Sequence, residues 1–165
     1  MMMAQIISMK LISIGSGLHG LILHFVFNIL DQEIDKIKQQ WKVMPGTVGL
    51  RTAKNKSRIP DLVILSETQC QEIREMSTAV LESPPLLAVE IVSSNNPDDD
   101  YHYKRSEYAV REIPEYWIID PKTKKVSILL LVSGFYEVAE FTQEQEIKSS
   151  LFPELKLTVK QIFEL

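Results

Sequence analysis

The sequence predicts an α/β fold organised around a strand, a crossover helix and a second strand. An apolar run at residues 86–92 has the length of one buried strand. A helix-like segment follows it, and a second apolar run at residues 116–119 ends in Asp120-Pro121. This succession is typical of two parallel strands joined by a helical crossover. With 165 residues, of which 45% are hydrophobic and 24% charged, the chain is long enough for one domain with a sizeable core.

The residues before this unit predict one long helix, three short strands and one short helix. Leu21, Phe25 and Ile29 lie along one face of a helix from about residue 18 to residue 40, which we expect to cover the core. Strands are expected at residues 41–44, 47–51 and 59–65, separated by turn-forming residues. Residues 67–76 are expected to form a short exposed helix.

Within the central strand, Glu90 is the residue that requires an explanation. An ionised carboxylate inside an apolar strand is costly to bury unless a cation or hydrogen-bond donors meet it. The helix expected after Asn96-Pro97 provides a cation, because Tyr101, Lys104 and Tyr108 share one face at helical spacing. Lys104 is therefore the candidate partner of Glu90.

The residues after Pro121 predict a scaffold that completes the domain. Strands are expected at residues 125–132 and 135–141 around a Ser133-Gly134 turn, and a short strand and a terminal helical turn are expected within residues 151–165. The apolar stretch at residues 128–132 is expected to form an exposed stripe suited to a homodimer interface.

The amino-acid composition limits the cellular compartment and the class of binding partner that we expect for the protein. A net charge of -4 argues against a general nucleic-acid coat protein, although a locally basic groove can still hold a phosphodiester. The single Cys70 excludes an intrachain disulfide and a cysteine-rich zinc site, which agrees with a reducing compartment, so a cytoplasmic location is expected. Glycine and polar residues interrupt the apolar residues 1–30, and we therefore expect no membrane association.

Several segments, in this order and at these spacings, resemble the Uma-type family of restriction-endonuclease-like proteins. This family is a branch of the PD-(D/E)XK nuclease superfamily in which the motif lysine has moved from the strand to the following helix. The matching segments are RIPDLVIL (58–65), LLAVEIVS (86–93), DYHYKRSEYA (100–109), IPEYWIIDP (113–121) and LFPELKLTVKQIF (151–163), with LHG (18–20) at the start of the first helix.

The resemblance implies a restriction-endonuclease-like core, in which a twisted mixed β-sheet is flanked by α-helices. Residues 1–165 would form a single PD-(D/E)XK nuclease-like domain, with residues 1–17 as an atypical N-terminal segment. Asp61 and Glu90 would bind Mg²⁺, or Mn²⁺ in its place, with the Ile91 carbonyl as a third ligand. Lys104 would stand near the scissile phosphate of a DNA substrate, and the reaction would be phosphodiester hydrolysis. The resemblance is also compatible with a homodimer.

Weaker candidates and an alternative function accompany this interpretation. His19, Arg58 and Tyr108 are weak candidates for substrate contacts, and the basic residues at positions 51–58 are more simply a solvated turn. We interpret Asp98, Asp99 and Asp100 as charges that complement the N-terminus of a helix. Asp61 and Glu90 could instead be satisfied by Arg58 or Lys104 without a metal. The alternative is then a catalytically inactive protein of the nuclease fold that binds nucleic acid or protein.

One departure from the family pattern concerns the backbone. Glu112 stands where the family usually has a glycine that ends the helix. A residue with a Cβ is strained in the left-handed conformation that such a helix end uses. The sequence therefore places the helix end in question, while the candidate chemistry is unaffected.

Overall fold

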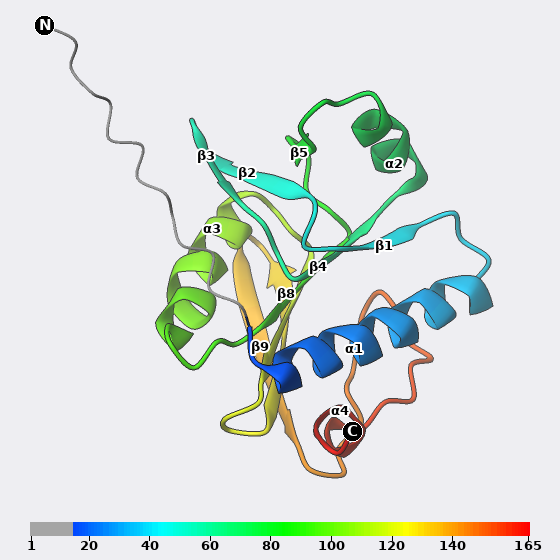
Figure 1. The fold of residues 1–165 in the computed structure, drawn as a ribbon, viewed down its shortest axis with the longest axis vertical. Coiled ribbons are helices and arrows are strands. Elements are labelled where there is room, and N and C mark those ends of the chain that lie inside the picture. Colours follow the sequence, from blue (N-terminus) through cyan, green and yellow to red (C-terminus); the bar gives the residue numbers. More distant parts are fainter. Residues whose placement is uncertain (1–14) are drawn as a thin grey trace, which may run out of the picture.

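A computed structural model describes residues 15–165, so the atypical segment expected at residues 1–17 lies almost entirely outside the described residues. The fold contains a six-stranded sheet flanked by helices (Figure 1). In spatial order its strands are β1 (Lys42–Pro45), β4 (Leu62–Leu65), β6 (Leu87–Ile91), β7 (Glu115–Asp120), β8 (Lys125–Val132) and β9 (Phe135–Thr142). A smaller sheet contains β3 (Lys56–Arg58), β2 (Gly49–Ala53) and β5 (Val80–Leu81).

The helices are α1 (Gly17–Lys36), α2 (Glu67–Arg74), α3 (Arg105–Val110) and α4 (Val159–Phe163), with a π-helical segment, η1 (Asp99–Lys104), directly before α3. In the large sheet β6 and β7 are parallel, and every other neighbouring pair is antiparallel. The crossover between β6 and β7 runs through η1 and α3. The predicted strand–helix–strand unit and the mixed sheet flanked by helices are therefore confirmed.

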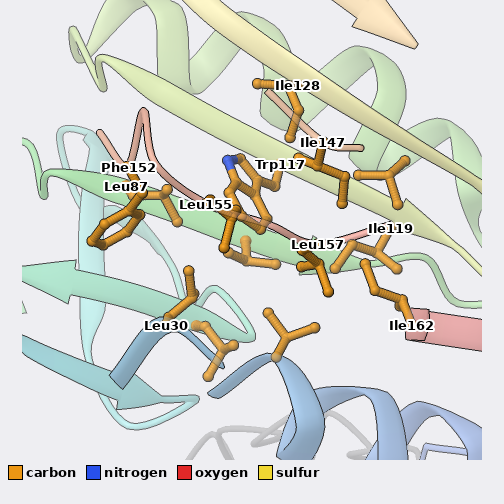
Figure 2. Close-up of a cluster of buried hydrophobic side chains, with 14 of the residues drawn as sticks. Leu30, Leu87, Trp117, Ile119, Ile128, Ile147, Phe152, Leu155, Leu157 and Ile162 are labelled. Atoms are coloured by element: carbon orange, nitrogen blue, oxygen red, sulfur yellow. The ribbon is translucent and has the colours of Figure 1, made fainter. Parts of the chain in front are cut away.

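Alternate residues of β6 contribute to two separate cores. Leu87, Val89 and Ile91 join the cluster that packs against α1 and α4, part of which Figure 2 shows. Ala88 belongs to the cluster on the opposite face, under α3. Since successive side chains of a strand point to opposite faces, Glu90 belongs to the α3 face with Ala88. Each buried aliphatic side chain contributes about 1.5–3 kcal/mol, so both layers hold β6 in place.

The helical crossover differs from the expected regular α-helix. Helical turns begin at Pro97, as predicted, but η1 is wound as a π-helix before α3 starts. π-Helical turns are rare and occur frequently at functional sites. A π-helical turn contains one more residue than an α-helical turn, which changes the angular spacing of the side chains. Tyr101 therefore does not contact Glu90, the residue that Lys104 and Tyr108 both contact. The Tyr101 hydroxyl donates to Asp120 Oδ2 at 2.8 Å.

Three other expectations about the scaffold are corrected. The stretch at residues 128–132 is not a continuous exposed stripe, because Ile128 and Leu129 are each only 1% exposed, Leu130 and Leu131 are partly buried, and Val132 alone is exposed. Residues 151–157 form no strand: they pack Phe152, Leu155 and Leu157 into the core in an irregular path. The sequence predicts neither strand β5 nor strand β3, and β3 lies within the basic residues 51–58 that were expected to form a solvated turn. None of the helices within residues 15–165 combines the length and apolar character needed to cross a membrane.

The end of α3 has the strain that the sequence indicates. Glu112 adopts a φ of 59°. Its N–H donates to the Ala109 carbonyl at 3.0 Å, and the Ile113 N–H donates to the Tyr108 carbonyl at 3.1 Å. These two bonds form the Schellman arrangement that normally has glycine at the left-handed position.

We expect Glu112→Gly to raise the free energy of unfolding by about 0.5–1 kcal/mol, because the relieved left-handed strain exceeds the extra chain entropy of glycine. Urea denaturation of the two proteins measures the difference. The matched control is Glu137→Gly on exposed β9, where the same exchange removes a side chain from a strand and is expected to destabilise. A loss of stability in Glu112→Gly would contradict the strain argument.

Candidate active site

Asp61 and Glu90 are brought together by the pairing of β4 with β6. The antiparallel register places Leu62 opposite Val89, so the next residues outward, Asp61 and Glu90, face each other across the two strands. Directly opposed residues on antiparallel strands project from the same face of the sheet. Asp61 is fixed by its own bond, because its Oδ2 accepts the Ile91 backbone N–H at 2.7 Å. The structure thus unites the two acids as the sequence predicts.

Glu90 is a buried carboxylate with two specific partners. Its residue is 2% exposed, the Tyr108 hydroxyl donates to Oε1 at 2.7 Å, and Lys104 Nζ lies 3.1 Å from Oε2. Burial raises the pKa of Glu90 to about 8, while the neighbouring Lys104 opposes that rise. A carboxyl group with this pKa is poised to lose its proton when further positive charge arrives. Lys104 therefore reaches Glu90 as expected. Tyr108, a weak candidate for a substrate contact, is instead fully buried and donates its hydroxyl to Glu90.

Lys104 bridges Glu90 and a second buried acid, Asp100. Lys104 Nζ donates to Asp100 Oδ1 at 2.6 Å, and Asp100 is 4% exposed. Burial would lower the pKa of Lys104, but the two carboxylates raise it above its ordinary value, which keeps the ammonium charged. Burial likewise raises the pKa of Asp100. The Lys104 side chain as a whole is 15% exposed.

Asp100 is the site residue that sequence reasoning missed. It was interpreted together with Asp98 and Asp99 as a helix N-terminal charge, but its carboxylate points inward. The Tyr116 hydroxyl donates to the Asp100 carbonyl at 2.9 Å and holds the π-helical turn against the sheet. The available signal was the spacing of Asp100 and Lys104, four residues apart on one helix face.

His19 reaches the site from the first turn of α1. Its Nε2 lies 3.5 Å from Asp61 Oδ2. The Ser16 hydroxyl accepts the His19 backbone N–H at 3.1 Å, which fixes the start of the helix beside Asp61. The hydrogen bond to Asp61 raises the pKa of His19, against the opposing effect of burial. His19 is therefore next to the acids, as the sequence suggests for a weak candidate.

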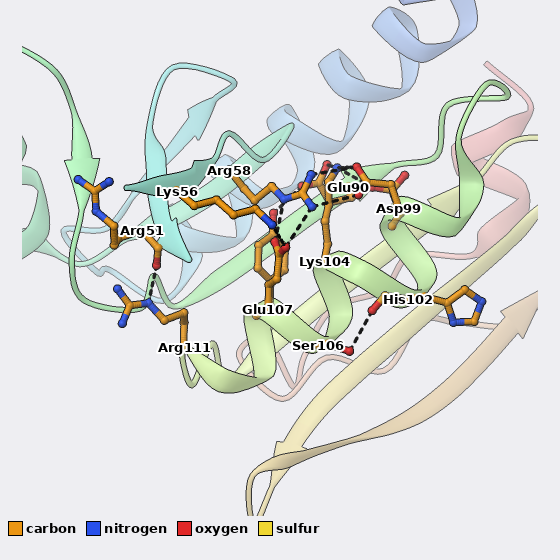
Figure 3. Close-up of polar contacts among 12 residues, drawn as sticks. Arg51, Lys56, Arg58, Glu90, Asp99, His102, Lys104, Ser106, Glu107 and Arg111 are labelled. Atoms are coloured by element: carbon orange, nitrogen blue, oxygen red, sulfur yellow. Dashed lines mark hydrogen bonds and ion pairs between the residues drawn. The ribbon is translucent and has the colours of Figure 1, made fainter. Parts of the chain in front are cut away.

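Arg58 is occupied by acids outside the Asp61–Glu90 pair. Its Nε donates to Glu107 Oε2 at 2.7 Å, its Nη2 donates to Glu107 Oε1 at 3.1 Å, and its Nη1 donates to Asp99 Oδ2 at 3.2 Å (Figure 3). Lys56 also contacts Glu107. The bonds of the Arg58 guanidinium connect β3 to both η1 and α3, and so stabilise the helical turn that carries Lys104. The structure does not bring Arg58 to Asp61 or Glu90.

A cleft opens beside Asp61 with a volume of about 530 Å³. Its walls come from the start of α1, the segment after β6 and the turn between β7 and β8. Asp61 and His19 line it, whereas Glu90 lies behind Asp61 and is buried. A substrate in this cleft would therefore meet Asp61 first.

The donor set fits a hard divalent cation that keeps part of its water shell. Within residues 15–165 no group of three or more His, Cys, Asp or Glu side chains is arranged to hold a metal ion. Mg²⁺, however, is commonly held by one or two carboxylates plus water. Asp61 and Glu90 supply such carboxylates across one strand pair.

Comparisons with known proteins agree with this geometry. A family model named Uma2, described as "Putative restriction endonuclease", matches residues 5–160. The chain is also similar in structure to "a putative nuclease belonging to DUF820" from Anabaena variabilis, with a TM-score of 0.73 and 16% identity, over 92% of this chain and 83% of that chain. At this identity the similarity shows the fold alone. A search of curated proteins finds no match.

Proposed function

Because the chain belongs to the Uma2 family, we propose that it is a divalent-metal-dependent endonuclease that hydrolyses phosphodiester bonds in DNA. One geometric feature supports this more than any other. Two carboxylates, Asp61 and Glu90, oppose each other on paired strands, and an ammonium group, Lys104, lies 3.1 Å from the buried member. Paired acids and a charged lysine are the groups that phosphoryl-transfer chemistry requires.

Asp61, Glu90 and the carbonyl of Ile91 would hold the metal ion, which we propose is Mg²⁺, with Mn²⁺ as a substitute. When bound, the ion would supply an activated water and neutralise charge on the phosphoryl oxygens. Glu90 has the raised pKa of a desolvated acid, so a nearby dication would favour its ionised form. The Tyr108 hydroxyl holds one of its oxygens in place.

Lys104 would orient the nucleophile or stabilise the charge that develops on the phosphate. Its side chain is 15% exposed, and the hydrogen bond to Asp100 fixes the direction of the ammonium. His19 would position Asp61 through the contact of its Nε2. The two positioning residues, His19 and Asp100, come from different elements, α1 and η1. The site therefore depends on the packing of both helices on the sheet.

The test is cleavage of supercoiled plasmid and of single-stranded DNA with Mg²⁺ or Mn²⁺, with and without a chelator. The expected result is nicked or linear plasmid that disappears when the metal is chelated. Glu90→Gln, which keeps the shape of the side chain, is expected to be inactive, and Glu137→Gln on exposed β9 serves as the matched control. Cleavage that persists with chelator, or that is equal in Glu90→Gln, would contradict the proposal.

A second function has one observation in its favour. Lys104 pairs with both Glu90 and Asp100, an arrangement in which the buried acids are satisfied by a lysine, as expected of a catalytically inactive protein of the nuclease fold that binds nucleic acid or protein. The same assay separates the two functions. Binding of DNA without cleavage under any metal condition would favour the inactive module.

A further inference from the structure

The cleft beside Asp61 contains very little positive charge. Its lining includes two acids, Asp61 and Asp120, and Lys122 is the sole lysine or arginine among the described residues that line it. A nucleic-acid strand brings one negative charge with each phosphate, and its affinity comes largely from basic side chains that meet those phosphates. The chain as a whole carries a net charge of -4, so general attraction does not supply this affinity. Lys122 and His19 are therefore the basic side chains available to a strand that enters the cleft.

The turn that carries Lys122 is firmly built. Asp120 is 5% exposed, and its Oδ1 accepts the backbone N–H groups of Lys122 at 3.0 Å and Thr123 at 3.3 Å. Its Oδ2 accepts the Tyr101 hydroxyl from η1. Pro121 restricts the backbone between them. The carboxylate of Asp120 is thus engaged by the turn itself, and the position of Lys122 in the cleft wall is fixed.

Lys122 is also available for a ligand. No carboxylate of the described part of the chain lies within ion-pair distance of its ammonium, whereas Lys125, three residues later, pairs with Glu140 at 3.0 Å. An exposed lysine that is not neutralised can contact a phosphate without first breaking an ion pair. The neighbouring Lys124 lines a different hollow, beside α4. The turn therefore presents two exposed lysines to two separate surfaces.

We propose that Lys122 is a substrate-binding residue whose ammonium contacts a backbone phosphate of the nucleic-acid strand, flanking the phosphate that is cleaved. The inference rests on the proposed function and deepens it by assigning the strand to the cleft formed by α1, the segment after β6 and the β7–β8 turn. Lys122 acts on affinity, while Asp61, Glu90 and Lys104 act on the reaction.

The test is the anisotropy of fluorescein-labelled single-stranded and duplex oligonucleotides, titrated with protein in EDTA at several KCl concentrations. Lys122→Ala is expected to weaken binding about three- to tenfold, and to reduce the slope of log affinity against log salt by about 0.7 for single strands and 0.9 for duplexes. Lys122→Arg should retain both values. Lys124→Ala, the matched control, should equal the wild type.

Cleavage rates separate this inference from the proposed function. If Lys122 only binds, Lys122→Ala raises the KM for DNA and leaves kcat within about twofold. Wild-type affinity and salt slope in Lys122→Ala would overturn the inference while leaving the nuclease function intact. Weakened binding together with no cleavage by the wild type would support Lys122 as a contact and contradict the nuclease. No binding of either oligonucleotide by the wild type would overturn both.

Discussion

Asp61→Asn is expected to lower the rate of metal-dependent DNA cleavage by about a thousandfold or more, because a negatively charged metal ligand becomes a neutral amide. Asparagine has nearly the same shape as aspartate, and its amide oxygen can still accept the Ile91 N–H that Asp61 Oδ2 accepts. The fold should therefore survive. Calorimetric titration with Mn²⁺ should show metal affinity reduced about a hundredfold, or lost, in the same variant.

Asp31→Asn is the matched control for this prediction. Asp31 is an exposed residue of α1, so the substitution makes the same change in net charge away from the candidate site. It should keep wild-type cleavage and metal affinity. Retained cleavage and retained metal affinity in Asp61→Asn would end the assignment of Asp61 as a ligand.

Lys104→Ala is expected to abolish cleavage and also to destabilise the fold. The substitution leaves Glu90 and Asp100 buried without the ammonium that lies 3.1 Å and 2.6 Å from their oxygens. Removing one partner of a buried ion pair typically costs about 3–5 kcal/mol. Cleavage should fall by about a thousandfold, because the positive charge near the phosphate is lost. Plasmid cleavage and urea denaturation measure the two effects.

A double variant separates the loss of chemistry from the loss of stability. Lys104→Ala combined with Asp100→Asn removes one of the two uncompensated charges and leaves both candidate metal ligands, Asp61 and Glu90, unchanged. We expect this variant to recover part of the stability and none of the cleavage. Recovery of cleavage together with stability would show that Lys104 serves the fold alone.

The sequence predicts the central unit well because burial leaves a clear pattern. The run that forms β6 is apolar except at Glu90, and β7 follows after a helical crossover, so the strand–helix–strand unit is readable without a structure. The same reasoning fails at β8. Its apolar stretch, expected as an exposed stripe, belongs to a strand that lies between β7 and β9, with Ile128 and Leu129 buried and Leu130 and Leu131 partly buried. Strands that are covered by neighbouring elements are hydrophobic along much of their length. The homodimer stays a prediction, and an exposed apolar stripe at residues 128–132 no longer supports it.

The candidate site is predictable from motif order except at one residue. Asp61, Glu90 and Lys104 follow from motif order, and all three meet in the structure. Asp100 is missed because it stands beside Asp98 and Asp99 at the start of a helix, although its spacing of four residues from Lys104 indicates the pair. Strand β5 is missed for a different reason: its two residues are held by the distant β2, and local sequence carries no trace of that pairing.

Glu112 shows the opposite case, in which the sequence indicates a backbone feature correctly. A residue other than glycine at the helix end predicted strain, and its φ of 59° agrees. The side chain is dispensable to the hydrogen bonds there, because both are made by backbone groups. Local backbone chemistry is thus readable from a single residue type, whereas the position of Arg58 required the distant Glu107 to be placed first.

We propose that Asp61 and Glu90 together hold one divalent cation between β4 and β6. Anomalous diffraction from crystals soaked in Mn²⁺ tests it most directly, because the ion is located without reference to activity. The account predicts one strong anomalous peak about 2.0–2.3 Å from a carboxylate oxygen of each residue. A peak elsewhere, or no peak while Lys104 Nζ still contacts Glu90, would contradict it.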